Sequence, residues 1–286
     1  MTIDPSIVGY STDEFFHTLE QRWSMAYAAS LKDMSKEYFD DVSYQPVLVH
    51  PLFPVCLEWP TLVDCFKKHK MSMQNMVHAT HDLHIFNPLT PGETYRTTAH
   101  IIGVEQKMPG IFLSWRIDTL DSRNKVVATT WQGNIFLGAS LSVPDRILEP
   151  LPEIPIPYAT ESQVKEQVPI EACSELAHTY TECARIWNPI HTEKSVANES
   201  GMTKPLLHGT ASLGLAVSKI TQLLLDDKTN RISRLGCRFS SPVTLPQELN
   251  LNIISTADET IHFELISKNG QKVLDRGFLC LSRLKS

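Results

Sequence analysis

Five prolines within sixteen residues divide this chain into two parts. They are Pro144, Pro150, Pro152, Pro155 and Pro157, between Val143 and Tyr158. Proline fixes the backbone angle φ and has no N–H to donate, so a segment this rich in proline forms neither a helix nor a central strand. We therefore predict an extended linker over residues 143–158, an N-terminal domain over 1–142 and a C-terminal domain over 159–286. A length of 286 residues suits two domains of ordinary size.

The N-terminal part shows helical spacing followed by strand-like runs. Aromatic and aliphatic residues recur every three or four positions from Ser11 to Asp33, which predicts a helix. A second helix is expected from Trp59 or Pro60 to about Lys70, because proline suits the first helical turn. Four runs rich in β-branched and aromatic residues follow, with turn residues between them, over Val77–Phe86, Tyr95–Lys107, Ile111–Leu120 and Lys125–Leu137.

The C-terminal part repeats this plan. We expect a short strand around Gln163–Pro169 and helices over Glu171–Arg185 and from about His208 to Asp226. Four strands are expected near Ile232–Phe239, Leu249–Ser255, Thr260–Ser267 and Lys272–Leu281. Similar phrases enter the second strand of each part, at 87–93 and 241–248, which indicates an internal duplication. The predicted fold class is α+β, a double hot dog in which each unit wraps an antiparallel sheet around a long helix.

A histidine-bearing turn and a helix-opening glycine stand close together in the C-terminal part. The turn is Trp187-Asn188-Pro189-Ile190-His191, and Leu207-His208-Gly209-Thr210 follows after sixteen residues, at the head of an apolar run. Imidazole titrates near neutral pH and can remove and return a proton. The free N–H groups at a helix start favour negative charge on a nearby oxygen. These two features suit the movement of a proton next to a carbonyl group.

The stretch from Tyr180 to His191 resembles the signature of type 2 (R-specific) enoyl-CoA hydratases and MaoC-like dehydratases. That signature has an aromatic residue, a short spacer, an aliphatic and a small residue, Gly, Asp, any residue, Asn, Pro, an aliphatic residue and His. The similarity continues through Lys-Pro-Leu-Leu-His-Gly at 204–209 and, more loosely, over nearly the whole chain, where the eukaryotic two-domain hydratase has the most similar pattern. In that family an Asp and a His activate the water that adds across the double bond of an acyl thioester, and the glycine binds the thioester oxygen.

This chain departs from the family signature at two positions. Arg185 and Ile186 stand where the family has Gly and Asp, so the carboxylate that partners the histidine is missing. Glu182, one helical turn before Ile186, is a weak candidate for a substitute acid. Arg185 is either a fork for a carboxylate or phosphate of the substrate, or a solvent-exposed cation at a helix end. We expect Trp187 to be a packing residue.

Each predicted site residue also has a structural interpretation. We predict His191 as the catalytic base, although a histidine after Asn-Pro can merely cap a turn. Asn188 either orients the substrate or holds the turn. Gly209 either donates its N–H to the substrate oxygen or only permits close helix packing, and both can hold. We expect His208 and Thr210, beside this glycine, to contact the substrate.

Three histidines at 78, 81 and 84 resemble a metal-binding cluster at first sight. Side chains alternate along a strand, so we expect His81 to point away from His78 and His84. No carboxylate or cysteine spacing completes a metal site, and we expect none. His78 matches a histidine in the family's first domain, where the acyl chain is accommodated, so the resemblance implies ligand contact at His78.

Composition limits the partners of the protein. The net charge is −6 and no run of Lys or Arg stands out, so we expect neither nucleic acid nor membrane as a partner. The six cysteines show no CxxC pair and no signal peptide is evident, so we expect an intracellular location, cytoplasmic or peroxisomal. A peroxisome-like tripeptide at 282–284 stands two residues before the end, where such signals are not read. We expect no cofactor, a small-molecule acyl substrate carried by CoA or another group, and a homodimer.

Three functions are compatible with these residues. The leading hypothesis is a lyase that adds water to, or removes it from, the α,β position of an acyl thioester or related carbonyl compound. The second is an isomerase or cyclase acting on a polyketide or other natural-product intermediate, because enolisation needs only one base. The third is a catalytically degenerate domain retained for acyl binding.

Overall fold

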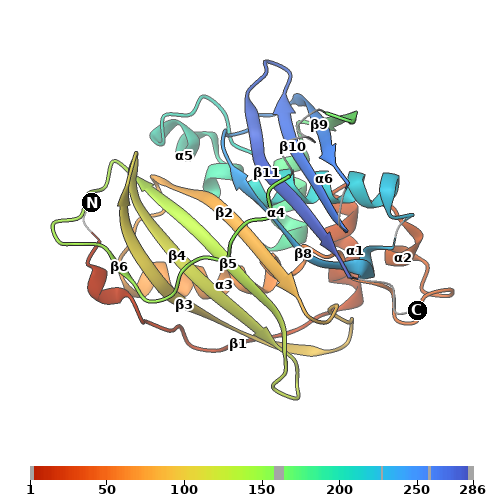
Figure 1. The fold of residues 1–286 in the computed structure, drawn as a ribbon, viewed down its shortest axis with the longest axis horizontal. Helices are drawn as coiled ribbons and strands as arrows, with labels where there is room; N and C mark the ends of the chain where they lie inside the picture. The colour runs from red at the N-terminus through yellow and green to blue at the C-terminus, as the bar shows by residue number, and fades with distance from the viewer. Residues whose placement is uncertain (1–2, 158–163, 227, 257–258, 283–286) are drawn as a thin grey trace.

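The computed structural model describes residues 3–157, 164–226, 228–256 and 259–282. Its main element is an antiparallel sheet with the strand order β1-β3-β4-β5-β2-β8-β11-β10-β9-β7, and β6 pairs with β3 (Figure 1). The N-terminal strands are β1 Phe15–Thr18, β2 Met76–Ile85, β3 Thr94–Lys107, β4 Gly110–Leu120, β5 Val126–Leu137 and β6 Arg146–Ile147. The C-terminal strands are β7 Glu166–Ala172, β8 Ile232–Phe239, β9 Gln247–Ser255, β10 Thr260–Ser267 and β11 Lys272–Leu281.

Each half of the sheet has one long helix. The helix α3 contacts β3 and β4, and α6 contacts β8 and β11. Both lie behind their strands in the view of Figure 1. The α-helices are α1 Gln21–Ser30, α2 Lys36–Phe39, α3 Pro54–Lys68, α4 Leu176–Ala184, α5 Lys194–Glu199 and α6 Gly209–Leu224, with short 3-10 helices at Pro5–Ile7, Pro189–His191 and Thr229–Arg231. Among the described residues, every helix is too short or too polar to cross a bilayer.

The two halves share one strand order. From its outer edge the N-terminal half runs β1-β3-β4-β5-β2, and the C-terminal half runs β7-β9-β10-β11-β8. The halves meet where β2 pairs with β8, from Thr80 opposite Arg238 to His84 opposite Arg234. The duplicated order and the two long helices confirm the predicted α+β double hot dog.

The core lies between the sheet and the helices. α6 is buried along most of its length, and the largest buried side chains around it include Tyr27, Phe53 and Tyr180. A second cluster under β3 and β4 contains Trp115 and Phe66, whose rings are 5.7 Å apart. Full burial of each such side chain contributes roughly 1.5–3 kcal/mol. Ile186, directly before the turn that carries His191, belongs to the first of these clusters.

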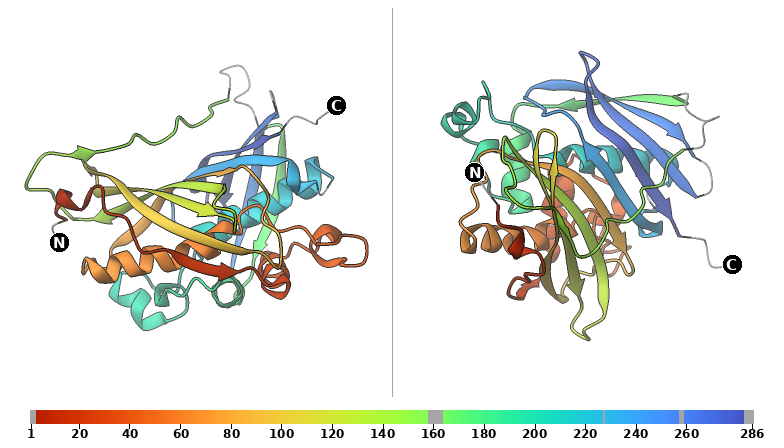
Figure 2. Two further views of the ribbon diagram at one scale, coloured as in Figure 1. Left: turned by 90° about the horizontal axis from the view of Figure 1, so that it is seen from below. Right: turned by 60° about the vertical axis from the view of Figure 1, so that its left-hand side comes forward.

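The proline-rich segment crosses the outer face of the sheet. Arg146 lies opposite Val104 in the β3–β6 pair, and the Glu149 carboxylate accepts hydrogen bonds from Arg116 and Trp131 at 2.5 and 3.0 Å. Figure 2 shows this segment and the helix α3 on opposite sides of the N-terminal strands. The segment is extended and crosses from one half to the other, while the domain limits at 142 and 159 stay predictions.

Most predicted strands agree with the structure to within two residues, but the helix predicted over Ser11–Asp33 is wrong. Phe15–Thr18 forms β1 and pairs with Thr94–Thr97 of β3, so only Gln21–Ser30 is helical. The distant strand β3 supplies hydrogen bonds that outweigh the local helical spacing.

Two further helix starts are wrong. The second helix begins at Pro54 and contains Pro60 in its interior. Glu171 lies in β7 opposite Glu248, and α4 begins only at Leu176. Gln163 of the predicted strand and residues 283–284 of the tripeptide lie outside the described residues.

Candidate active site

The histidine of the sequence motif is held by a backbone carbonyl. His191 ends the 3-10 helix Pro189–His191, whose first turn is capped by the Asn188 side chain, since its Oδ1 accepts from the Ile190 N–H at 3.4 Å. The His191 Nδ1 lies 2.8 Å from the Leu206 carbonyl oxygen. A carbonyl oxygen can only accept, so Nδ1 carries the proton in the neutral ring. The lone pair is therefore on Nε2. A general base that acts through Nε2 requires this tautomer.

His208 stacks on His191 and joins the two parts of the motif. The ring centroids are 3.5 Å apart and the planes differ by 24°. His208 is 3% exposed, and its Nε2 donates to the Ile186 carbonyl oxygen at 3.2 Å. This geometry makes His208 a support for the His191 ring. Its predicted contact with substrate stays a prediction.

Both imidazoles are neutral at neutral pH. Burial lowers the pKa of His191 to about 4, and the Leu206 carbonyl opposes part of this effect. Burial, with a smaller contribution from neighbouring His191, lowers the pKa of His208 well below its usual value. Because a neutral imidazole can accept a proton, His191 is a base before any substrate binds.

Gly209 is the first residue of α6, directly after His208. The N–H groups of a first helical turn have no acceptor within the helix. A Cβ atom at Gly209 would lie 2.9 Å from Cδ1 of Phe239, so the glycine lets this ring approach the backbone. The ring of Phe239 is in turn 4.5 Å from that of His78. The packing role is therefore visible in the structure, and the binding of a substrate oxygen by Gly209 stays a prediction.

Thr210 belongs to a buried chain of hydroxyl groups. Its Oγ1 accepts from the Tyr180 hydroxyl at 3.0 Å, and the Tyr180 and Tyr27 hydroxyl oxygens are 3.4 Å apart. This chain links α6 to α4 and α1. The substrate contact predicted for Thr210 is untested, and its hydroxyl already serves the packing of these helices.

Arg185 and Ile186 take different directions from the end of α4. Arg185 adopts the left-handed conformation (φ 58°), and its guanidinium lies 4.0 Å over the Trp23 ring and 3.6 Å from the Glu20 carboxylate. Ile186 is 6% exposed and packs in the core. Among the described residues, no hydrogen bond or ion pair joins a carboxylate to His191. The proposed role of Arg185 toward substrate stays a prediction, since its present partners are protein side chains.

Glu182 and Trp187 lie at the surface of this region. The Trp187 Nε1 donates to the Glu182 carboxylate at 3.3 Å, and 57% of Trp187 is exposed. Trp187 is therefore not the packing residue that we predicted. The Glu182 carboxylate is bound to this exposed indole, which gives no support to the idea that it replaces the missing acid.

The prediction that His81 points away from His78 is wrong. A register shift between His78 and Thr80 inserts one extra residue into β2, and the rings of His78 and His81 are 5.4 Å apart. A bulge of this kind reverses the alternation of side chains. His84 lies 3.3 Å from the Asp82 carboxylate. The described residues contain no group of three side chains that could hold a metal ion.

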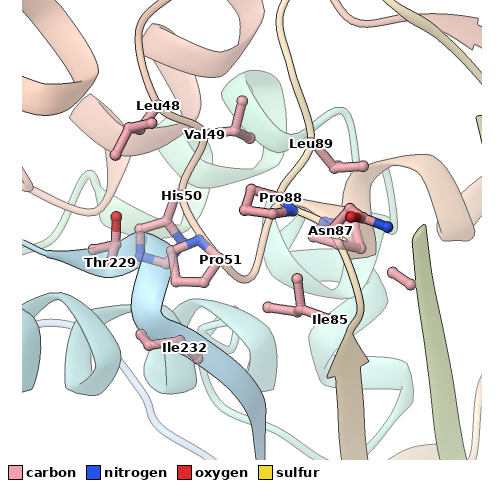
Figure 3. Close-up of a pocket in the computed structure, with 12 residues that line it drawn as sticks. Leu48, Val49, His50, Pro51, Ile85, Asn87, Pro88, Leu89, Thr229 and Ile232 are labelled. Atoms are coloured by element: carbon pink, nitrogen blue, oxygen red, sulfur yellow. The ribbon is translucent and has the colours of Figure 1, made fainter. Parts of the chain in front are cut away.

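Two cavities lie away from His191. One, of about 20 Å³, is lined by residues such as His50, Pro51, Ile85 and Ile232 and has room for a single water molecule (Figure 3). The other, of about 210 Å³, lies between the end of α1, β7 and α6 and is lined by residues such as Lys32 and Lys219. Neither is lined by a predicted site residue, so neither identifies where a substrate binds.

The duplicated strand order and the two long helices define a double hot dog fold. Residues 156–276 match the family model "MaoC like domain", and residues 6–130 match "FAS1-like, dehydratase domain region". The C-terminal half thus matches the model of a MaoC-like domain, which confirms the resemblance seen in the motif.

Known proteins show the same relationship at low identity. The chain is 21% identical over 255 residues to the peroxisomal multifunctional enzyme type 2 of Drosophila melanogaster, which is 87% of this chain and 42% of that protein. It is 29% identical over 66 residues to the enoyl-CoA hydratase ChsH3 of Mycobacterium tuberculosis, 23% of each chain. The chain thus matches less than half the length of either relative. A MaoC-like dehydratase from Phytophthora capsici has the same fold, with a TM-score of 0.82, 19% identity and 96% of each chain covered.

Proposed function

We propose that the protein is a hydro-lyase that interconverts an enoyl thioester and its β-hydroxyacyl thioester, with His191 as the proton carrier. The observation that supports this most is the stacked pair of His191 and His208 directly before Gly209. It brings a neutral base and the open start of a helix together. The family matches and the enoyl-CoA hydratase relative support the same reaction class.

The proposed reaction balances with this one base. In the dehydration direction Nε2 of His191 takes the α-proton, and the N–H of Gly209 stabilises the negative charge on the thioester oxygen. The Cβ–O bond then breaks, the proton on His191 goes to the leaving hydroxyl, and water departs. Asn188 orients the substrate, and the Leu206 carbonyl keeps the His191 ring in position through both transfers. Substrate tails extend toward His78 on the inner face of the N-terminal strands.

The test is turnover of crotonyl-CoA, longer enoyl-CoAs and β-hydroxyacyl-CoAs by wild type and His191→Ala. Loss of a positioned acid-base group typically costs ~10²–10⁴ in rate. His178→Ala, which changes an exposed histidine of α4, is the matched control and should retain full activity. If His191→Ala matches wild type, the assignment of the base is wrong. If no substrate is turned over by wild type but acyl-CoA raises its melting temperature, the protein is an acyl-binding domain.

A second candidate is isomerisation or cyclisation on the same site. The absence of a carboxylate beside His191 among the described residues favours it, because enolisation needs one base and no activated water. Mass spectrometry of the product separates the two: an unchanged mass indicates isomerisation, and a gain or loss of water indicates the hydro-lyase.

A further inference from the structure

Polar side chains gather on the inner face of the sheet where its halves meet. Gln132 of β5 lies directly opposite His81 of β2, so the two side chains share one face. Thr130, two residues before Gln132 on this face, donates to the Glu58 carboxyl of α3 at 2.5 Å. The shared face is therefore the one that covers α3. In a hot dog unit this face of the sheet is normally apolar.

His81 is enclosed on this face without hydrogen bonds. It is 1% exposed, and neither of its ring nitrogens has a partner among the described residues. The side-chain amide of its neighbour Gln132 donates to Asn134 Oδ1 at 3.0 Å. Glu58 is 2% exposed, and its Oε2 atom also lacks a hydrogen-bond partner among the described residues. Buried polar atoms are paired in the great majority of cases, and each unpaired one costs roughly 1–3 kcal/mol.

Successive contacts connect this face to the proposed catalytic site. Gly209 is packed against the Phe239 ring, the Phe239 ring lies 4.5 Å from the His78 ring, and the His78 ring lies 5.4 Å from the His81 ring. These contacts form a continuous row from Gly209 to His81, and an acyl chain bound at Gly209 would follow this row once the Phe239 ring rotates.

We propose that the inner face around His81 binds an oxygen carried by the substrate's acyl chain, so that the preferred substrates are acyl thioesters with a hydroxyl group beyond the reacting carbons. This inference rests on the proposed function and specifies its substrate class. A neutral imidazole offers one N–H and one lone pair, and a hydroxyl group can pair with either of them. Burial raises the pKa of Glu58 to about 8, so its carboxyl is also neutral at neutral pH and can donate. A plain hydrocarbon chain would leave all three atoms unpaired.

The test compares a medium-chain trans-enoyl-CoA with analogues that carry one hydroxyl group at successive positions along the chain. Wild type should prefer at least one hydroxylated analogue by about tenfold or more in kcat/KM, which corresponds to one or two buried hydrogen bonds. His81→Leu should abolish this preference by lowering the rate for the hydroxylated substrate while keeping or raising that for the plain one. His81→Gln, which retains a donor and an acceptor, should restore part of it. His84→Leu, which changes a histidine of the same strand paired with Asp82, is the matched control and should keep the preference.

The outcomes separate this inference from the proposed function. Equal turnover of both substrates by wild type, or an equal effect of His81→Leu on both, overturns the inference and leaves the hydro-lyase standing. If wild type turns over neither, the hydro-lyase fails, and calorimetric binding of the same two CoA thioesters decides the inference. Tighter binding of the hydroxylated analogue, lost in His81→Leu, supports it, and equal binding refutes it.

Discussion

Replacement of Gly209 by alanine tests the site most sharply, because the same helix offers a matched replacement. The added Cβ would lie 2.9 and 3.0 Å from two atoms of the Phe239 ring. Carbon atoms prefer roughly 3.5–4.0 Å, so the ring must move by about 0.5–1 Å. The His78 ring, 4.5 Å away, limits how far the Phe239 ring can move in that direction. Overpacking of this kind costs about 1–3 kcal/mol in the free energy of unfolding.

Gly214→Ala imposes a similar clash without touching the site. Its Cβ would lie 2.8 Å from both Cδ atoms of Leu31, at the flexible end of a side chain. We expect both variants to lose stability in urea unfolding. The gain in helix propensity, about 1 kcal/mol for alanine over glycine, offsets more of the loss at the mid-helix position.

The two variants should differ in catalysis. A displacement of about 1 Å near the reacting atoms can cost ~10²-fold in rate, so Gly209→Ala should lose between about tenfold and a hundredfold in kcat/KM. Gly214→Ala should stay within about twofold of wild type, because residual overpacking at Leu31 moves no proposed site atom. The assay is the loss of enoyl thioester absorbance with crotonyl-CoA, at a temperature where both variants are folded. Equal kinetics for the two variants would refute the placement of the substrate oxygen at the head of α6.

Three further predictions concern His81, Ile186 and Arg185. Burial lowers the pKa of His81 to about 4 from 6.5, so the unfolded chain binds more protons below pH ~6.5. The free energy of unfolding is therefore unaffected by this group above pH ~6.5. It should fall by about 2 kcal/mol between that pH and pH ~5, because the unfolded chain takes up the proton and the folded chain does not. Urea unfolding of His81→Leu should show a flatter dependence of this free energy on pH. Ile186→Asp restores the family's acid and should raise the hydration rate of crotonyl-CoA about tenfold or more; an unchanged rate would mean that this position does not limit the reaction. Arg185→Gly removes the strain of a left-handed residue at φ 58°, which is worth about 1 kcal/mol. It also loses the contact with Trp23, which is worth about 0.5–1 kcal/mol. The melting temperature should therefore change little.

The repeated plan of the fold could be predicted from the sequence because its signals are local. Turn residues and β-branched runs locate the strands, as in Ile232–Phe239, where predicted and observed limits coincide. The failure at Phe15–Thr18 has a different origin. Its pairing partner lies about eighty residues away at Thr94–Thr97, and no local pattern contains that information.

The site shows the same division between local and distant information. The family motif places a histidine turn before a helix-opening glycine, and the structure brings them together. The stacking of His208 on His191 depends on the Ile186 carbonyl and could not be read from side-chain types. The bulge after His78, which turns His81 inward, has no glycine or proline beside it in β2, and its one glycine lies on the partner strand opposite Thr80.

The resemblance implies that Arg185-Ile186 replaces the family's Gly-Asp, and the structure shows contacts that hold His191 without a carboxylate. Ile186 holds His208 through its backbone carbonyl, which any side chain can provide, and His208 holds the His191 ring. The left-handed strain at Arg185 is offset by the contacts with Trp23 and Glu20. An anionic partner would raise the proton affinity of His191. In this structure burial instead lowers the pKa of His191 to about 4. A base of low proton affinity works best on an acidic C–H bond. The proposed site therefore has a weaker base than an Asp-His pair would supply, and Ile186→Asp is the single change that should strengthen it.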